Sequence, residues 1–351
     1  MKAREMRGLQ HLVFSTTNRC TARCLDCPVV HEGGPPSTLT GEQMRGVIDE
    51  VMGWGTLRLV VFTGGEPFLL GDELRRTVAH AARYGVFTRI VTNAYWATSR
   101  ARAEHLLKKY KDAGLTEINI SCDDYHQQFV PLRNVKYASE AALDLAFPLL
   151  IAHRRVPGSR ITTDYLSEFL GVELREFRPA ENHDGAGVFL SNHHVPIRAR
   201  VEGRKLDGCD VDETSWQGPC PVVMREIVIS PNRQVEICCG IARSSIQELC
   251  IGSLAEESLL SILARGNRDL IVNWLALAGP ASIAEFVRSK EPMIDLPNAY
   301  VNRCHLCNEL FTRDDVRRIL RACAPERGEM VALMRGILDW VSEEWVRSMN
   351  P

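Results

Sequence analysis

Short apolar runs rich in β-branched residues recur along the first half of the chain at intervals of about thirty residues, as in successive β-α units. The expected strands are Leu12–Ser15, Leu57–Phe62, Val86–Val91, Glu117–Ser121, Phe147–His153 and Val172–Phe177. Apolar residues between them recur at helical spacing. The expected helices are Thr40–Trp54, Leu74–Ala81, Ser99–Gly114 and Asn134–Ala146. This alternation predicts an α/β fold built on a parallel, barrel-like sheet.

The carboxyl ends of the strands in such a barrel form one mouth, where active sites are built. Polar, glycine-rich and ionisable clusters follow the expected strands at these ends. They are Cys20–Cys27, Thr63–Pro67, Thr92–Trp96 and Ser121–His126. Asp124 and His126 are therefore candidates for orienting a substrate or accepting its proton, because histidine titrates near neutral pH.

Composition narrows the class of protein. The 351 residues leave room for a barrel and an accessory domain. Lys and Arg number 42 and Asp and Glu 44, so neither a nucleic-acid partner nor a membrane surface is expected. The first residues lack the apolar region of a signal peptide, and we expect a cytoplasmic protein. In that compartment the 12 cysteines are expected to be metal ligands rather than disulfides.

Three cysteines, Cys20, Cys24 and Cys27, lie within one short loop after the first expected strand. A [4Fe–4S] cluster normally takes four cysteines, so three would leave one iron open to an exogenous ligand. The alternative is a zinc site, for which His31 is the nearest further ligand.

The CX3CX2C spacing of this loop resembles the signature of the radical S-adenosylmethionine (SAM) enzymes. The resemblance implies a partial (β/α)6 TIM-like barrel and a [4Fe–4S] cluster whose open iron binds SAM. It also implies a flavodoxin- or ferredoxin-type reductant. An electron from the cluster would cleave SAM to methionine and a 5′-deoxyadenosyl radical, which abstracts a hydrogen atom from a substrate.

A second motif follows the strand Leu57–Phe62 and is similar to the family's GGEP sequence, which holds the amino group of SAM. In similar proteins, polar residues at the next strand ends contact the carboxylate and ribose of SAM. The cofactor-binding residues that the resemblance implies are Gly64, Gly65, Glu66, Pro67, Thr92, Asn93, Ser121 and Asp123. For Ser121 and Asp123, capping of the following turn is an equal alternative.

Cysteines are dense after about residue 200. Cys220 and Cys238 flank an expected hairpin with arms Glu226–Ser230 and Gln234–Ile237. Together with Cys304 and Cys307 they resemble the Twitch domain, a shortened SPASM domain that binds one auxiliary [4Fe–4S] cluster. Cys239 could replace Cys238, because Arg233 stands where the family has glycine. A zinc knuckle of Cys238, Cys239, Cys304 and Cys307 is the alternative.

The resemblance divides the chain into three parts: a radical SAM barrel (1–200), an auxiliary-cluster domain (201–311) and covering helices (312–351). Two cysteines of the second part that are not needed as ligands, Cys250 and Cys209, are candidates for donating hydrogen to a substrate radical. The alternative is that each packs as a small buried apolar residue.

Two outcomes of hydrogen abstraction are expected: dehydrogenation or bond formation, and epimerisation. Only Met1–His11 precede the first expected strand, which leaves no room for a leader-binding domain. We therefore expect a natural-product intermediate, such as an aminocyclitol, sugar or amino acid, as substrate. A maturase for a short ribosomal peptide is the first alternative. A non-catalytic iron–sulfur relay is the second, and the open iron argues against it.

Overall fold

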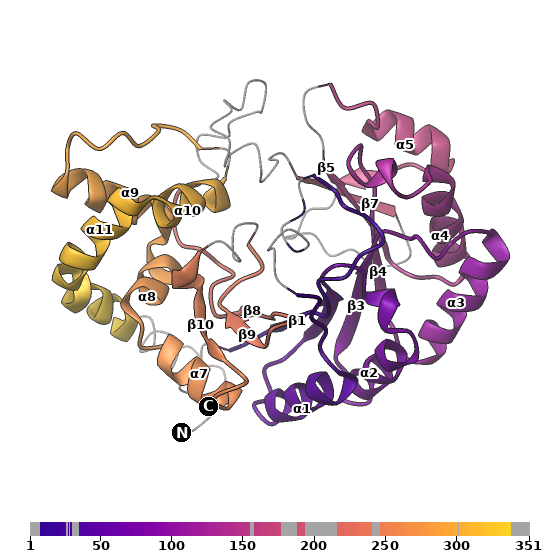
Figure 1. Ribbon diagram of the computed structural model, residues 1–351, viewed down its shortest axis with the longest axis horizontal. Helices are drawn as coiled ribbons and strands as arrows, with labels where there is room; N and C mark the ends of the chain where they lie inside the picture. Colours follow the sequence, from indigo (N-terminus) through magenta and orange to yellow (C-terminus); the bar gives the residue numbers. More distant parts are fainter. Residues whose placement is uncertain are drawn as a thin grey trace, which may run out of the picture.

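The computed structural model describes residues 8–25, 27, 29, 35–154, 158–176, 188–193, 216–240, 246–300 and 302–337. One ten-stranded sheet, in the order β10-β9-β8-β1-β2-β3-β4-β5-β7-β6, passes through both halves of the molecule (Figure 1). Its strands from β1 to β7 pair in parallel. They are β1 (His11–Ser15), β2 (Leu59–Thr63), β3 (Phe87–Thr92), β4 (Glu117–Ser121), β5 (Leu149–Arg154), β6 (Arg175–Glu176) and β7 (Val188–His193). The α/β class with a parallel sheet is confirmed.

Helices connect the first strands and cover the outer face of the sheet (Figure 1). They are α1 (Gly41–Met52), α2 (Asp72–Ala82), α3 (Arg100–Asp112), α4 (Leu132–Asp144) and α5 (Thr163–Leu170), with short 3-10 turns η2 (Pro67–Leu70) and η3 (His126–Gln128). Polar caps fix where the helices begin. Thr40 and Gln43 form a capping box at α1, and Ser99 caps α3 as expected from its sequence.

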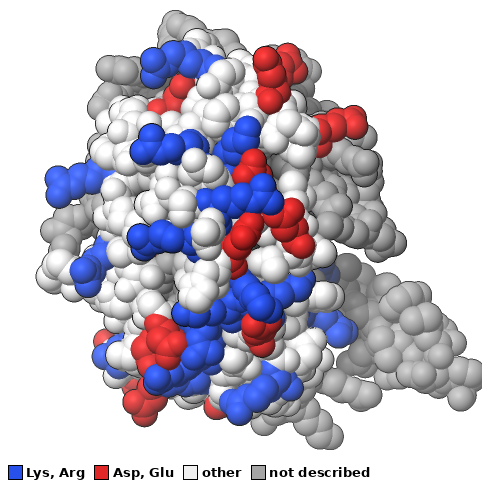
Figure 2. All heavy atoms as spheres, turned by 90° about the vertical axis from the view of Figure 1, so that its right-hand side faces the viewer, with Lys and Arg blue, Asp and Glu red and all other residues white. Residues whose placement is uncertain are grey.

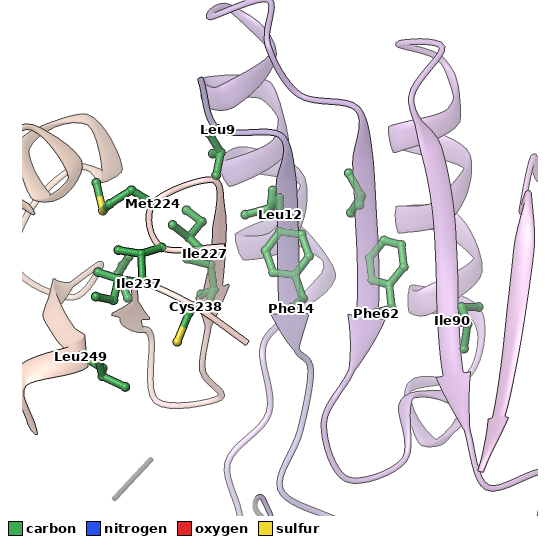
Figure 3. Packing of buried hydrophobic residues seen from close by; sticks show 14 of the residues in the cluster. Leu9, Leu12, Phe14, Phe62, Ile90, Met224, Ile227, Ile237, Cys238 and Leu249 are labelled. Atoms are coloured by element: carbon green, nitrogen blue, oxygen red, sulfur yellow. The ribbon is translucent and has the colours of Figure 1, made fainter. Parts of the chain in front are cut away.

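The two faces of the sheet carry different side chains because neighbouring residues of a strand point to opposite sides. Leu12, Phe14, Phe62 and Ile90 lie in the main apolar core, which also contains side chains of the helices (Figure 3). On the opposite face, the described residues include a second and smaller cluster of Val13, Leu59, Val61 and Val228. Beside it, Arg89 and Glu117 form an ion pair at 2.8 Å. This second, more polar face leads to the candidate site.

The strand pattern beyond β5 differs from our prediction. The expected strand Val172–Phe177 is confined to β6, and β7, which we did not predict, lies between β5 and β6. The apolar run of β7 is short, and in the described part of the chain no helix of the usual length separates it from β6, so the β-α spacing used for the other strands did not reveal it. The expected strand Glu117–Ser121 matches β4 residue for residue.

The C-terminal part extends the sheet. In the predicted hairpin, β8 (Glu226–Ile229) and β9 (Gln234–Glu236) pair antiparallel, and β8 also pairs in parallel with β1. The sheet is thus continuous across the expected domain boundary at residue 200. The remaining elements are η5 (Gln247–Leu249), β10 (Cys250–Ser253), α7 (Leu259–Gly266), α8 (Leu270–Leu277), α9 (Gly279–Lys290), α10 (Arg303–Thr312), α11 (Asp314–Cys323), η6 (Ala324–Arg327) and a helix over 328–337.

Within the described part of the chain, no single helix is long and apolar enough to cross a membrane. Only α8 and α9 taken together pass by length and composition, and they are bent by 115° relative to each other.

Candidate functional site

The cysteine loop, residues 20–27, follows the carboxyl end of β1. Cys24 is buried, and Cys20 and Cys27 are partly exposed. Burial, together with the smaller effect of nearby negative charges that include the neighbouring thiols, raises the pKa of Cys20 to about 11 and that of Cys24 to about 12. Backbone amides of Ala22 and Val29 donate to the sulfurs of Cys20 and Cys27, at 3.4 Å each. The three thiols therefore form one group. The alternative ligand His31 lies outside the described residues.

Two glycines at the end of β2 hold the start of this loop. The Gly65 amide donates to the Thr17 carbonyl oxygen at 2.6 Å, and the Glu66 amide donates to that of Arg19 at 2.9 Å. A Cβ at Gly65 would collide with the Arg19 carbonyl oxygen, and Gly64 adopts φ 123°. Only glycine permits this approach of two backbones. The glycines thus position the cysteine loop directly.

The Glu66 carboxylate is buried and accepts hydrogen bonds inside the protein. It accepts hydrogen bonds from the Thr92 hydroxyl (2.8 Å), the Asn93 amide (2.9 Å) and the Phe68 amide (3.2 Å). Burial raises the pKa of Glu66 to about 7, although these hydrogen bonds act in the opposite direction. Pro67, also buried, begins η2. The carboxylate thus joins the strand ends of β2 and β3.

Asn93 connects the end of β3 to the cysteine loop. Its side-chain amide donates to the Thr21 hydroxyl at 3.0 Å and lies 3.6 Å from the Cys20 sulfur. Its side-chain oxygen accepts from the Tyr95 amide. Because Thr92 pairs with Ile120, the register brings Asn93 beside Ser121, which is partly exposed at the end of β4. Two predicted cofactor-binding residues thus lie at neighbouring strand ends, and Asn93 is the one next to the first cysteine.

Asp123 and His126 form a pair at the next strand end. Asp123 accepts hydrogen bonds from the His126 ring and amide, at 2.8 Å and 3.0 Å. Burial opposes ionisation of Asp123, but the hydrogen bonds that it accepts from His126 prevail and lower its pKa. The Asp123 charge also raises the pKa of Cys24, which places it near the thiols. Asp124, in contrast, accepts from the Arg160 amide at 2.8 Å and holds the loop before α5.

Four further cysteines, which we call the C-terminal cysteine pocket, surround one hollow. They are Cys220, Cys238, Cys304 and Cys307, and the other walls are mostly apolar. Cys304 and Cys307 lie three residues apart on α10 and so share a face of that helix. Burial raises the pKa of Cys238, and the charges of Cys307, Cys304 and Cys220 raise it further.

The structure distinguishes the two adjacent cysteines after the hairpin. Cys238 is buried and lines the C-terminal cysteine pocket, whereas Cys239 is exposed and hydrogen-bonds with Glu226. Arg233, in the hairpin turn, adopts φ 63°, the backbone conformation that glycine would favour. The hairpin therefore keeps its geometry despite the missing glycine.

Of the two candidate hydrogen-atom donors, Cys250 lies in the described part of the structure. The Cys250 thiol, at the start of β10, donates to the Gln234 side chain at 3.2 Å, and burial raises its pKa. Cys209 lies outside the described residues. The hydrogen bond ties Cys250 to its own strand pair.

The two groups of thiols differ from a site for a single metal ion. Among the described residues, no three His, Cys, Asp or Glu side chains converge as ligands of a single metal ion. Three grouped thiols in one place and four in another match the soft sulfur donors that iron–sulfur clusters take. The residues present therefore fit a cluster at each place by their chemistry.

Comparison with known families decides the class of the first half. Residues 14–147 match the model of the Radical SAM superfamily. The chain contains a radical SAM domain. This domain includes the cysteine loop, Gly64, Gly65, Glu66 and Asn93, and the family implies a [4Fe–4S] cluster and SAM.

Two curated relatives match more than half of the chain. A "Putative peptide biosynthesis protein YydG" from Bacillus subtilis (strain 168) is 23% identical over 84% of this chain and 89% of the relative. A GTP 3′,8-cyclase from Campylobacter fetus subsp. fetus is 27% identical over 64% of this chain and 67% of the relative. The crystal structure of BtrN in complex with AdoMet and 2-DOIA has a TM-score of 0.48 and 13% identity, over 79% of this chain and 91% of that one.

The sequence did not predict the contacts that Asn93 and Glu66 make within the protein. It predicted that both residues bind SAM, but not that Asn93 contacts Cys20 or that Glu66 contacts Thr92. No local signal could have shown these contacts, because they join strand ends far apart in the sequence.

Proposed function

We propose that this protein is a radical SAM enzyme that abstracts a hydrogen atom from a C–H bond of a peptide, with an auxiliary [4Fe–4S] cluster as electron acceptor or relay. The observation that carries the proposal is the grouping of three thiols in a loop held by Gly64 and Gly65 at the carboxyl edge of the sheet. When bound, the cluster and SAM supply the 5′-deoxyadenosyl radical.

The residues around the cysteine loop have distinct roles in this proposal. Cys20, Cys24 and Cys27 hold the first cluster, and Asn93 donates a hydrogen bond toward the Cys20 sulfur. Ser121 and Asn93, on the polar face, would contact SAM. Asp123 fixes the His126 ring, so that the other ring nitrogen can accept a substrate proton.

The auxiliary cluster is assigned to Cys220, Cys238, Cys304 and Cys307. Four thiolates leave no open iron, and apolar walls keep water away. These properties suit electron storage rather than substrate binding. An oxidative reaction would use such a store, because removal of a hydrogen atom and then a proton leaves one electron to be accepted.

A peptide is proposed as substrate because the Bacillus subtilis relative, which matches this chain over most of both lengths, is described by its name as a peptide biosynthesis protein. The small natural-product intermediate expected from the sequence stays a prediction. That prediction was based on the short segment before the first strand, and the comparison with the relative does not test it.

Anaerobic reconstitution tests the proposal. Reduced protein with SAM should form 5′-deoxyadenosine, and a perdeuterated peptide hydrolysate should transfer deuterium into it. Perdeuterated glucose serves as the small-molecule control. Deuterium from glucose and none from peptides would contradict the peptide proposal. Absence of 5′-deoxyadenosine with every reductant would contradict radical SAM activity and favour the iron–sulfur relay.

The outcome of abstraction can be read from product mass. Dehydrogenation lowers the peptide mass by two hydrogens, whereas epimerisation in D2O with a thiol donor adds one deuterium. If a thiol donates, its Ala variant should stall after hydrogen abstraction. The variants to compare are Cys122→Ala, Cys209→Ala, Cys239→Ala, Cys250→Ala and Cys323→Ala. Full product formation by all five would remove these thiols from the mechanism.

A further inference from the structure

The chain that follows the cysteine loop turns back onto the residues that precede it. Thr38 pairs with Thr17 in an antiparallel bridge. The Asn18 side-chain oxygen accepts a hydrogen bond from the Ser37 amide at 2.8 Å, and the Asn18 amide donates to the Ser37 carbonyl oxygen at 3.1 Å. We call residues 35–39 the clasp, because they close the ends of a segment that contains all three cysteines of the loop.

Thr17 connects the clasp to the glycines at the end of β2. Its hydroxyl lies 2.7 Å from the Thr38 hydroxyl and accepts a hydrogen bond from the Arg19 amide at 3.1 Å. Its carbonyl oxygen accepts from the Gly65 amide at 2.6 Å. A displacement of the clasp would therefore move the residues directly before Cys20.

The clasp also contacts the C-terminal part of the chain. The Ser37 hydroxyl donates to the Pro231 carbonyl oxygen at 2.8 Å. Pro231 lies in the turn between β8 and β9, and the hairpin lies beside β1 (Figure 1). Because Phe14 pairs with Ile229 in parallel, this turn lies at the carboxyl end of β1, where the cysteine loop begins. The Ser37 hydroxyl thus joins the hairpin turn to the clasp.

The hairpin turn has a fixed geometry. The Ser230 amide donates to the Gln234 carbonyl oxygen at 2.9 Å, and the Ser230 hydroxyl accepts from the Gln234 amide at 3.0 Å. The Arg233 carbonyl oxygen accepts from the Leu254 amide at 2.8 Å. The other end of β9 is followed by Cys238, which lines the C-terminal cysteine pocket. The hairpin therefore extends from the second group of thiols to the clasp.

We propose that Ser37 is a positioning residue for the first cluster, which it couples through the clasp to the hairpin that carries Cys238. The inference rests on the proposed function, because it requires a cluster at each group of thiols. A cluster that fixes Cys238 also fixes the hairpin turn, and the hydrogen bond between Ser37 and Pro231 passes this constraint to Thr17 and the cysteine loop. SAM should therefore bind more tightly when the second cluster is present.

The test is a double-mutant cycle of four anaerobically reconstituted proteins. They are the native protein, Ser37→Ala, the four-cysteine variant with Cys220, Cys238, Cys304 and Cys307 replaced by Ala, and the combination of both changes. Equilibrium binding of radiolabelled SAM is measured for each protein. Loss of the second cluster should weaken SAM binding about fivefold when Ser37 is present, and should have no effect when it is replaced by Ala.

Steady-state kinetics give a second measurement that does not need the four-cysteine variant. In Ser37→Ala with both clusters, KM for SAM should rise about fivefold, with a smaller change in the rate of 5′-deoxyadenosine formation at saturating SAM. Ser37→Thr keeps a hydroxyl and should keep the native KM. Failure of Ser37→Ala to assemble the first cluster, with assembly in Ser37→Thr, would also support the positioning role.

Two further variants are controls. Ser289→Ala removes a hydroxyl-to-carbonyl hydrogen bond of the same kind within α9. Arg100→Ala breaks exposed ion pairs with Glu104 and Asp144 on the face that carries α3 and α4, where Lys and Arg lie among Asp and Glu (Figure 2). Exposed pairs contribute little to stability, so this variant controls for a small general loss of stability. Both variants should bind SAM as the native protein does.

The positioning proposal is overturned if Ser37→Ala binds SAM as tightly as the native protein, or if both controls weaken SAM binding as much as Ser37→Ala does. It is also overturned if the effects of Ser37→Ala and of losing the second cluster multiply, because independent effects would mean that Ser37 does not couple the two regions. Absence of 5′-deoxyadenosine with the native protein instead contradicts the proposed function.

Discussion

The cysteine loop and the C-terminal cysteine pocket bring thiols together in opposite surroundings. The loop follows the carboxyl end of β1 and is bordered by Asn93, Asp123 and other polar groups. The pocket has mostly apolar walls. By register, Val13 pairs with Val228 and Val228 with Glu236, so Cys238 lies toward the amino end of β1. One sheet therefore separates the two groups of thiols along its strands.

This difference shows how the number of thiol ligands and their surroundings suit the two clusters to different kinds of chemistry. Three thiols beside polar side chains suit a cluster that must bind an exogenous ligand. Four thiols in an apolar hollow suit a closed cluster that exchanges only electrons. Each region depends on a glycine where two backbones meet: Gly65 against Arg19, and Gly279 against Gly218, two residues before Cys220.

The largest expected effect comes from removing one thiol set at a time. With Cys20, Cys24 and Cys27 replaced by Ala, 5′-deoxyadenosine formation should cease, and roughly half the iron should remain. With Cys220, Cys238, Cys304 and Cys307 replaced by Ala, the remaining iron should still support SAM cleavage. Iron analysis and timed 5′-deoxyadenosine assays measure both. Retention of two clusters, or of none, by the first variant would contradict the division of ligands.

Substitution of Gly65 or Gly279 should also remove one cluster at a time, without changing a cysteine ligand. Gly65→Ala should cost about 3 kcal/mol or more locally and prevent assembly of the first cluster, because the added Cβ meets the Arg19 carbonyl. Gly279→Ala should do the same to the second, because Gly279 has φ 77° and faces the Gly218 carbonyl. Visible absorption and EPR of each reconstituted variant would show which cluster remains.

A matched control for both variants is Gly46→Ala in α1. Apart from its two chain neighbours and the backbone of α1, no described atom lies within 4 Å of the position of the added Cβ, and alanine favours a helix by about 0.5–1 kcal/mol. Both clusters should assemble in this variant. Loss of both clusters in Gly65→Ala would mean that the two regions fold together rather than separately.

A smaller effect should appear in the pH dependence of stability. The pKa of Glu66 is about 7 when folded and near 4.5 when unfolded, so the unfolded chain loses this proton first. The free energy of unfolding should therefore fall by about 3 kcal/mol as pH rises from 4.5 to 7, and no further above it. Glu66→Gln removes this contribution, although its amide nitrogen would oppose the Asn93 amide at a cost of about 1 kcal/mol.

Urea unfolding of the cluster-free protein between pH 5 and 8 measures this contribution. The stability of Glu66→Gln relative to the native protein should rise between pH 5 and 7. Glu168→Gln, at an exposed position of α5, is the control and should follow the native curve. Parallel curves for all three proteins would show that Glu66 does not titrate in this range.

What the sequence could predict was local. The strand Glu117–Ser121, the cap at Ser99 and the hairpin between Cys220 and Cys238 were each predicted from a short-range pattern. The helix α10, which carries Cys304 and Cys307, was not predicted. Pairing of β8 with β1 joins residues about two hundred positions apart and leaves no periodic mark. The contact of Asn93 with Cys20 could not be predicted from the sequence for the same reason, because it also joins residues far apart in the chain.

The smallest effect should come from that contact. Hydrogen bonds to cluster sulfurs help set the reduction potential, and Asn93 is a donor toward the Cys20 sulfur. Asn93→Asp keeps an acceptor for the Tyr95 amide but replaces the donor with a carboxylate, so it should make the first cluster harder to reduce and leave the second unchanged. Potentiometric titration followed by EPR separates the two clusters.

Gln234→Ala, which removes the partner of Cys250, is the control and should shift neither potential, because Cys250 is assigned to neither cluster. Equal shifts of both clusters in Asn93→Asp would instead mean that the contact acts through the fold as a whole rather than on the Cys20 sulfur.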